Sequence, residues 1–132
     1  MPNEVKPLPF SSPLIGISDK TLTIHHDKLY AGYATKKQET QDKLQAFAKN
    51  SDLSSANQTY SELRGLKTGE SFAVNGVYLH EAYFDNLGGD GKPEGPLLDE
   101  LIKEYGAFEN FLNYYSACGL AARGWVVLAW DM

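Results

Sequence analysis

The sequence predicts an α+β fold: an N-terminal antiparallel helical hairpin, followed by further helices and the first strand of a truncated C-terminal α/β domain. Two long stretches carry apolar residues at the three- and four-residue steps of amphipathic helices. A Gly- and Pro-rich segment then precedes a shorter helical region, and the last residues are β-branched and aromatic, as in a buried strand. We therefore expect an arm and hairpin at 1–88, a linker at 89–95 and a partial α/β domain at 96–132.

Length, charge and cysteine content restrict the class of protein. The chain has 132 residues, of which 42% are hydrophobic, as expected for one globular domain or two very small ones. A net charge of −5 argues against non-specific nucleic-acid binding, which depends on clustered Lys and Arg. The single cysteine, Cys118, cannot form an internal disulfide and suits a reducing, cytoplasmic compartment. No apolar stretch approaches the roughly 18 residues that span a bilayer, so no membrane partner is expected.

The first half of the chain predicts an extended arm and a long helix. Prolines keep residues 1–13 out of regular helix, so this segment should lie extended over the surface. A helical pattern starts at Ser18, which suits an N-cap, and continues to about Asn50. Residues 51–69 indicate a loop with a short helical turn. Because side chains at i and i+4 stack along a helix, the inner face is expected to carry Leu22, His25, Leu29 and Tyr33.

The second half predicts three more helices and a strand. A helix beginning near Glu70 carries an apolar stripe made of Ala73, Gly76, Val77, His80, Phe84 and Leu87. Two shorter helices should follow at 97–105 and 108–122, around a break at Gly106. Residues 124–132 then predict a buried strand. A lone strand leaves its backbone groups without partners, so we expect either that the sequence is partial or that a second copy supplies the pairing edge.

Histidines on two separate apolar stripes are the main chemical signal. His25 and His80 would face each other from packed helices, and facing neutral imidazoles suit a transition metal. The alternative is that each is a core histidine hydrogen-bonded to its surroundings, and spacing alone leaves both readings open. His26 lies one step round the helix, which favours a supporting or structural role. A zinc-protease H-E-x-x-H motif is excluded, because Phe84 stands where the second histidine is needed.

Five stretches, in order, resemble the iron/manganese superoxide dismutase family over nearly the whole chain: LPF, TIHHDKLYAGY, VYLHEAYFDNLGG, GPLLDELIKEYGAFENF and GWVVLAW. The resemblance implies that His25 and His80 are metal ligands. It also implies that Lys28 is an electropositive neighbour and that Tyr33 is the tyrosine at the gateway to the site. Trp125, after Gly124, corresponds to a tryptophan that walls the metal pocket. His26 is expected to support the ligands from behind.

Departures from the family pattern affect the expected chemistry. Leu29 and Tyr30 replace a second histidine pair, so the solvent and proton network should differ. Gly76 stands where iron-type members often carry glutamine and manganese-type members carry glycine, which favours manganese slightly. The family's other two ligands come from a later D-x-W-x-H-A-Y motif that these 132 residues do not contain. Asp131 follows a tryptophan but matches no ligand position.

The resemblance implies disproportionation of superoxide to dioxygen and hydrogen peroxide at one iron or manganese ion per subunit, and a homodimer. For these 132 residues alone we expect little or no activity, since only two of the four protein ligands are present. Two alternatives remain open. One is a non-catalytic metal-binding relative of the family, and the other is a purely structural helical module that pairs with a partner chain.

Overall fold

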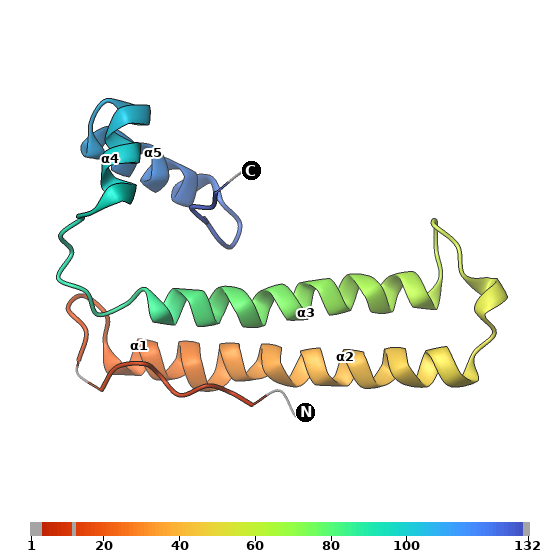
Figure 1. The fold of residues 1–132 in the computed structure, drawn as a ribbon. Helices are drawn as coiled ribbons and strands as arrows, with labels where there is room; N and C mark the ends of the chain where they lie inside the picture. The colour runs from red at the N-terminus through yellow and green to blue at the C-terminus, as the bar shows by residue number, and fades with distance from the viewer. Residues whose placement is uncertain (1–3, 12, 131–132) are drawn as a thin grey trace. The chain divides into compact units, whose positions relative to one another are not determined.

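The computed structural model describes residues 4–11 and 13–130. The chain separates into two compact units, Met1–Gly88 and Gly89–Met132. The first unit contains an extended arm and two long antiparallel helical segments, and the second contains two short helices and an irregular tail (Figure 1). The N-terminal antiparallel helical hairpin that the sequence predicts is confirmed.

The first helical segment is continuous but not uniform. It consists of α1 (Asp19–Thr23), a π-helical segment η1 (Ile24–Tyr30) and α2 (Ala31–Asn50). Ser18 is its N-cap, because the Ser18 hydroxyl accepts a hydrogen bond of 3.1 Å from the backbone N–H of Thr21. The sequence analysis anticipated an unbroken α-helix here, so the π-helical segment is a new feature of the structure.

The inner face of η1 lies one position later than the sequence predicted. Its two buried residues are His26 and Tyr30, four positions apart, and Ala34 continues this stripe into α2. Tyr30 is 1% exposed, whereas Leu29 is 53% exposed. The prediction that Leu29 lies on the inner face was therefore wrong, because the buried stripe runs through His26 rather than through His25. Such π-helical insertions occur frequently at functional sites.

The second long helix, α3 (Glu62–Asp85), starts earlier than the expected position near Glu70. Its N-cap is Ser61, whose hydroxyl accepts a 3.3 Å hydrogen bond from the backbone N–H of Arg64. The expected short turn before it is the 3₁₀ segment η2 (Leu53–Ser55). The N-cap at Ser61 and the acidic residue in the first turn, Glu62, stabilise this earlier start.

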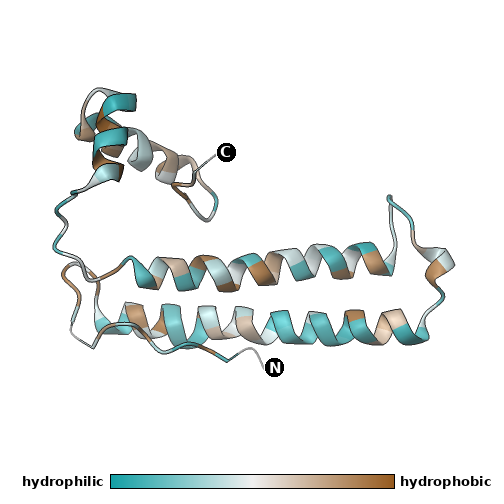
Figure 2. Ribbon diagram, in the orientation of Figure 1, coloured by the Kyte–Doolittle hydropathy of each residue, from teal (hydrophilic) through white to brown (hydrophobic). Residues whose placement is uncertain are grey.

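The core of the first unit lies where the end of η1 and the start of α2 meet the C-terminal half of α3. Its buried residues are packed against partly buried side chains that include two from the arm, Val5 and Leu8. The buried set is Tyr30, Ala34, Val77 and Phe84. Away from this core, the second half of α2 is mostly hydrophilic (Figure 2), so the far end of the hairpin contributes little apolar burial.

The second unit contains α4 (Pro96–Tyr105) and α5 (Phe108–Ala121). Gly106 separates them in the left-handed region, at φ 80°, which glycine adopts without steric cost. The break at Gly106 was predicted. Tyr105 packs against Phe111 with ring centroids 5.5 Å apart, which joins the two helices.

The expected C-terminal strand is not present in the part of the chain that the structure describes. Residues 124–130 are irregular, and Trp130 and Val127 are 77% and 59% exposed. A strand requires a second strand to accept and donate its backbone hydrogen bonds, and the described residues provide none. The described part of the chain is therefore helical rather than α+β. The last two residues of the expected strand, Asp131 and Met132, lie outside the described residues.

None of the described helices is both long enough and apolar enough to cross a membrane.

Candidate metal centre

The two histidines on the apolar stripes lie side by side. The ring centroids of His25, on η1, and His80, on α3, are 4.9 Å apart, and the rings meet edge to face at 81°. His80 is 3% exposed and His25 is partly buried. Two helices that are far apart in sequence thus bring two imidazoles together at one end of the hairpin.

A backbone hydrogen bond defines the tautomer of His80. Its Nδ1 lies 2.6 Å from the carbonyl oxygen of Gly76, one turn earlier on α3. A carbonyl can only accept, so Nδ1 carries the proton and the lone pair of the neutral ring is on Nε2. Metal-binding histidines usually donate their other ring N–H to a carbonyl or carboxylate in this way.

The surroundings of His25 favour its neutral form. Burial lowers the pKa of His25, and the nearby His80 lowers it further through charge repulsion. Aromatic rings account for much of this burial, since the centroids of Tyr83 and Phe84 lie 5.0 Å and 5.3 Å from that of His25. A neutral imidazole is the form that binds metal ions.

Tyr33 lies beside the histidine pair, and Gly76 makes room for it. The Tyr33 ring is 5.2 Å from that of His80, centroid to centroid, and 5.7 Å from that of Phe72. A Cβ atom added to Gly76 would lie 2.6 Å from both Cγ and Cε1 of Tyr33. The close packing of Tyr33 therefore explains why position 76 is a glycine, whatever the identity of a bound metal.

His26 and Lys28, which also lie on η1, make contacts different from those of the His25–His80 pair. His26 is buried, with Nδ1 2.6 Å from a carboxylate oxygen of Asp27 and Nε2 2.8 Å from the carbonyl oxygen of Lys6. It therefore ties the arm to η1. Lys28 is exposed on the same segment.

Two residues that the sequence analysis did not assign to the site, Glu81 and Lys6, lie beside it. The Tyr30 hydroxyl donates to Oε1 of Glu81 at 2.9 Å and accepts from the backbone N–H of Lys6 at 3.1 Å. Burial raises the pKa of Tyr30, and this outweighs the opposing effect of the Lys6 N–H. Burial also opposes ionisation of Glu81, but hydrogen bonds from Lys6 and Tyr30 hold its pKa below its usual range. The hydrogen bond from Tyr30 to Glu81 therefore has a neutral phenol as its donor and an ionised carboxylate as its acceptor.

The described residues, 4–11 and 13–130, contain no cluster of three or more His, Cys, Asp or Glu side chains suited to a metal ion. A metal ion held by the histidine pair would therefore have two of the three or four protein ligands that such ions normally take. Trp125 is in the second unit and is 36% exposed. Its expected role as a wall of the metal pocket stays a prediction.

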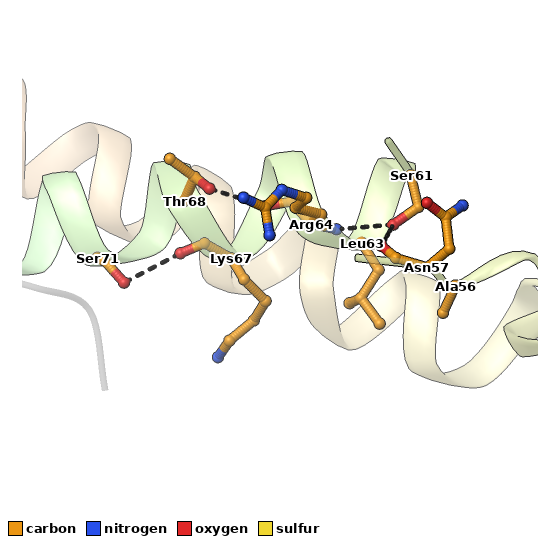
Figure 3. Close-up of a pocket in the computed structure, with 8 residues that line it drawn as sticks. All are labelled: Ala56, Asn57, Ser61, Leu63, Arg64, Lys67, Thr68 and Ser71. Atoms are coloured by element: carbon orange, nitrogen blue, oxygen red, sulfur yellow. Dashed lines mark hydrogen bonds between the residues drawn. The ribbon is translucent and has the colours of Figure 1, made fainter. Parts of the chain in front are cut away.

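A separate hollow at the start of α3 does not involve the histidines. It has a volume of about 560 Å³ and is lined by polar and apolar side chains near the turn between the long helices (Figure 3). The hydroxyls of Thr68 and Ser71 donate to the carbonyls of Arg64 and Lys67, one turn earlier on α3. The Ser61 hydroxyl donates to the carbonyl of Asn57, before the helix. Arg64 precedes His80 by 16 positions on α3, which corresponds to about 24 Å of helix.

Comparison with known proteins identifies the family. No family model matches the chain. The chain is 42% identical over 123 residues to an iron superoxide dismutase of Aquifex aeolicus, a match covering 90% of the chain. It is also 34% identical over 121 residues to an iron superoxide dismutase of Sulfolobus acidocaldarius, covering 87% of the chain.

A third relative, a manganese superoxide dismutase of Haloarcula marismortui, is 30% identical over 132 residues, covering 97% of the chain. The chain belongs to the iron/manganese superoxide dismutase family. The matches cover 56% of the length of the Aquifex and Sulfolobus proteins and 62% of the Haloarcula protein. Within this family, the chain therefore corresponds to little more than half of the relatives it matches, and the histidine pair lies in that matched part.

Proposed function

We propose that this chain is the part of a superoxide dismutase that supplies two metal ligands, His25 and His80. The reaction converts two superoxide ions and two protons into dioxygen and hydrogen peroxide, with one ion oxidised and the other reduced. The observation that carries the proposal is the edge-to-face contact of the two imidazoles, in a chain that is similar to iron and manganese superoxide dismutases.

The spacing of the two rings fits a shared cation. With a metal–nitrogen bond of about 2.1 Å, two imidazoles on one ion at angles of about 90–120° have centroids about 4.5–5.5 Å apart. The observed separation of 4.9 Å lies within that interval. The Nδ1–H of His80 is already donated to Gly76, which leaves Nε2 as the basic nitrogen. The ring spacing is compatible with a shared cation, and the similarity to iron and manganese superoxide dismutases favours ligation over the alternative of two unrelated core histidines.

Other residues of the chain would bind and guide the anion. The ion supplies one-electron redox chemistry when bound, by alternating between its +3 and +2 states. Lys28 is exposed three positions after His25 and offers a positive charge to superoxide on an otherwise acidic chain. Tyr33 packs beside His80, which supports a role in limiting access to the pair.

Two imidazoles alone bind a divalent ion weakly, so the 132-residue chain is expected to be a poor catalyst. The test combines metal analysis and a superoxide assay on the chain and on a His25→Ala, His80→Ala double variant. We expect measurable manganese or iron binding by the chain, little turnover, and loss of binding in the double variant. Equal metal binding by both proteins would refute the assignment of the ligands, and full activity with one equivalent of metal would refute the expectation of poor catalysis.

A non-catalytic, metal-binding role is the second candidate. It is favoured by Leu29 and Tyr30, which stand where the family usually has two further histidines. A longer form that carries further ligands distinguishes the two functions. Metal binding with superoxide turnover supports the dismutase, and metal binding without turnover supports the non-catalytic relative.

We further propose a cytoplasmic homodimer with a slight preference for manganese and no nucleic-acid or membrane partner. The acidic charge and the single cysteine support the location and the lack of a nucleic-acid partner. Exposed apolar side chains close to the histidine segment support self-association: Ile24, Leu29 and Phe72 are 40%, 53% and 69% exposed. Light scattering coupled to gel filtration tests the dimer, and a monomeric mass at micromolar concentration would exclude it.

A further inference from the structure

The N-terminal arm is fastened to the helical hairpin through one buried phenol. Tyr30 is the most completely buried large side chain among the described residues, at 1% exposure. Its hydroxyl accepts from the backbone N–H of Lys6 and donates to Glu81, at 3.1 Å and 2.9 Å. The Lys6 ammonium group lies 2.5 Å from the other oxygen of Glu81. Three residues from the arm, η1 and α3 therefore form a closed polar ring of contacts.

The backbone N–H and the backbone carbonyl of Lys6 are both hydrogen-bonded to residues of η1. Its N–H is bound by Tyr30, and its carbonyl oxygen lies 2.8 Å from Nε2 of His26. Both partners are in the π-helical segment. His26 and Tyr30 are four positions apart and are the two buried residues of η1, so both face the arm.

The same phenol also covers the candidate ligand on α3. The Tyr30 ring stacks on that of His80 with a centroid distance of 6.1 Å and an interplanar angle of 22°. Glu81, which accepts the Tyr30 hydrogen bond, is the residue directly after His80. The His80 imidazole thus lies nearly parallel to a ring that is itself hydrogen-bonded on two sides, and it meets the His25 ring edge to face.

We propose that Tyr30, Glu81 and Lys6 form a positioning network that sets the orientation of the His80 imidazole and makes the arm part of the metal site. This inference rests on the proposed function for its relation to the metal. A phenylalanine at position 30 would fill the core equally well, and a buried hydroxyl is costly unless it is hydrogen-bonded. The Tyr30 hydroxyl therefore restricts the orientation of the Tyr30 ring relative to α3 and the arm, rather than adding to the packing of the core.

The test compares Tyr30→Phe with Tyr78→Phe in the full 132-residue chain. Both changes remove only a hydroxyl, and Tyr78 is an exposed residue of α3 whose ring lies under the Lys37 ammonium. The first readout needs no metal: long-range ¹H–¹⁵N NMR reports which ring nitrogen of His80 is protonated. We expect the Nδ1–H tautomer, which the Gly76 carbonyl defines, in the parent and in Tyr78→Phe. In Tyr30→Phe the His80 ring is less restrained, so its hydrogen bond to Gly76 should weaken and the two tautomers should average.

The second readout is the affinity for Co²⁺, followed by its visible absorption. Loss of a residue that orients a ligand lowers metal affinity about tenfold or more, so we expect this for Tyr30→Phe and less than twofold change for Tyr78→Phe. Glu81→Gln, which keeps an oxygen that can accept from Tyr30, should retain more affinity than Glu81→Leu. A merely structural role would lower the melting temperature and leave the tautomer and the affinity unchanged.

The outcomes separate this inference from the proposed function. If Tyr30→Phe folds and keeps both the parent tautomer and the parent Co²⁺ affinity, the positioning network is refuted. If the parent binds no Co²⁺, the proposed function fails, and the tautomer measurement still decides whether Tyr30 orients His80. Should Tyr30→Phe prove unfolded by circular dichroism, the pair Glu81→Gln and Glu81→Leu decides, and equal tautomer populations in both would overturn the inference.

Discussion

A substitution at Gly76 tests the packing of the candidate site most directly. A Cβ atom at this position would lie 2.6 Å from two ring atoms of Tyr33, more than an ångström inside ordinary contact, so Gly76→Ala must displace the ring. Such overpacking costs about 1–3 kcal/mol. Replacing glycine by alanine inside a helix stabilises it by about 1 kcal/mol. We therefore expect the free energy of unfolding of Gly76→Ala to range from unchanged to about 2 kcal/mol lower.

The matched control is Gly65→Ala in the same helix. A Cβ atom at Gly65 would meet nothing within 4 Å, so only the helix-propensity gain applies, and this variant should be about 1 kcal/mol more stable than the parent. The difference between the two variants, about 1–3 kcal/mol, isolates the steric contact with Tyr33.

Urea unfolding followed by circular dichroism measures both variants, and a difference of 1 kcal/mol corresponds to about 4–8 °C in melting temperature for a unit of this size. If Gly76→Ala is stabilised as much as Gly65→Ala, then Tyr33 does not pack on Gly76 and the geometry described for the site is incorrect.

Three further predictions concern a helix cap, a titration and a charge. Ser61→Ala should lower the free energy of unfolding by about 1 kcal/mol, because it removes the N-cap of α3; Ser71→Ala, inside the same helix, should have little effect, and equal losses would contradict the role of the cap. The pKa of His25 lies below its ordinary value of 6.5, so the folded state binds fewer protons than the unfolded state near and below that value. The free energy of unfolding should thus fall as the pH is lowered from 7 to 5, and less steeply in His25→Gln; parallel pH profiles would count against the burial of His25. Lys28→Glu in a longer, active form should slow superoxide turnover at low ionic strength and matter less at high salt; unchanged kinetics at both salt concentrations would remove Lys28 from the reaction.

The long helices and their pairing were predictable because the relevant signals are local. Apolar residues at helical spacing and serine caps at the starts indicate helices without knowledge of the rest of the fold. The start of α3 was nevertheless placed too late, because the cap at Ser61 was not recognised within the segment 51–69. The contact between His25 and His80 followed from the stripes once the helices were packed, whereas their role as ligands stays a prediction.

The parts of the site that were missed depend on residues distant in the sequence. Nothing in the local spacing showed that the buried stripe of η1 runs through His26 rather than through His25, so Leu29 was placed inside and Tyr30 was not. The contact of Lys6 with Glu81 joins residues 75 positions apart, and a charged arm residue has no local pattern that indicates its partner. The signals that existed were the position of Glu81 next to a candidate ligand and the aromatic character of Tyr30.

The helical segments, the break at Gly106 and the two apolar stripes that each carry a histidine could be predicted from the sequence, because these features depend on neighbours a few residues away. The π-helical form of η1, the inward position of Tyr30 and the docking of the arm on η1 and α3 emerge only in the folded chain, because burial and hydrogen bonds to distant residues outweigh local helical preference there. The same reason explains the C-terminal segment. Residues 124–130 have strand-forming side chains, but a strand exists only when another strand pairs with it.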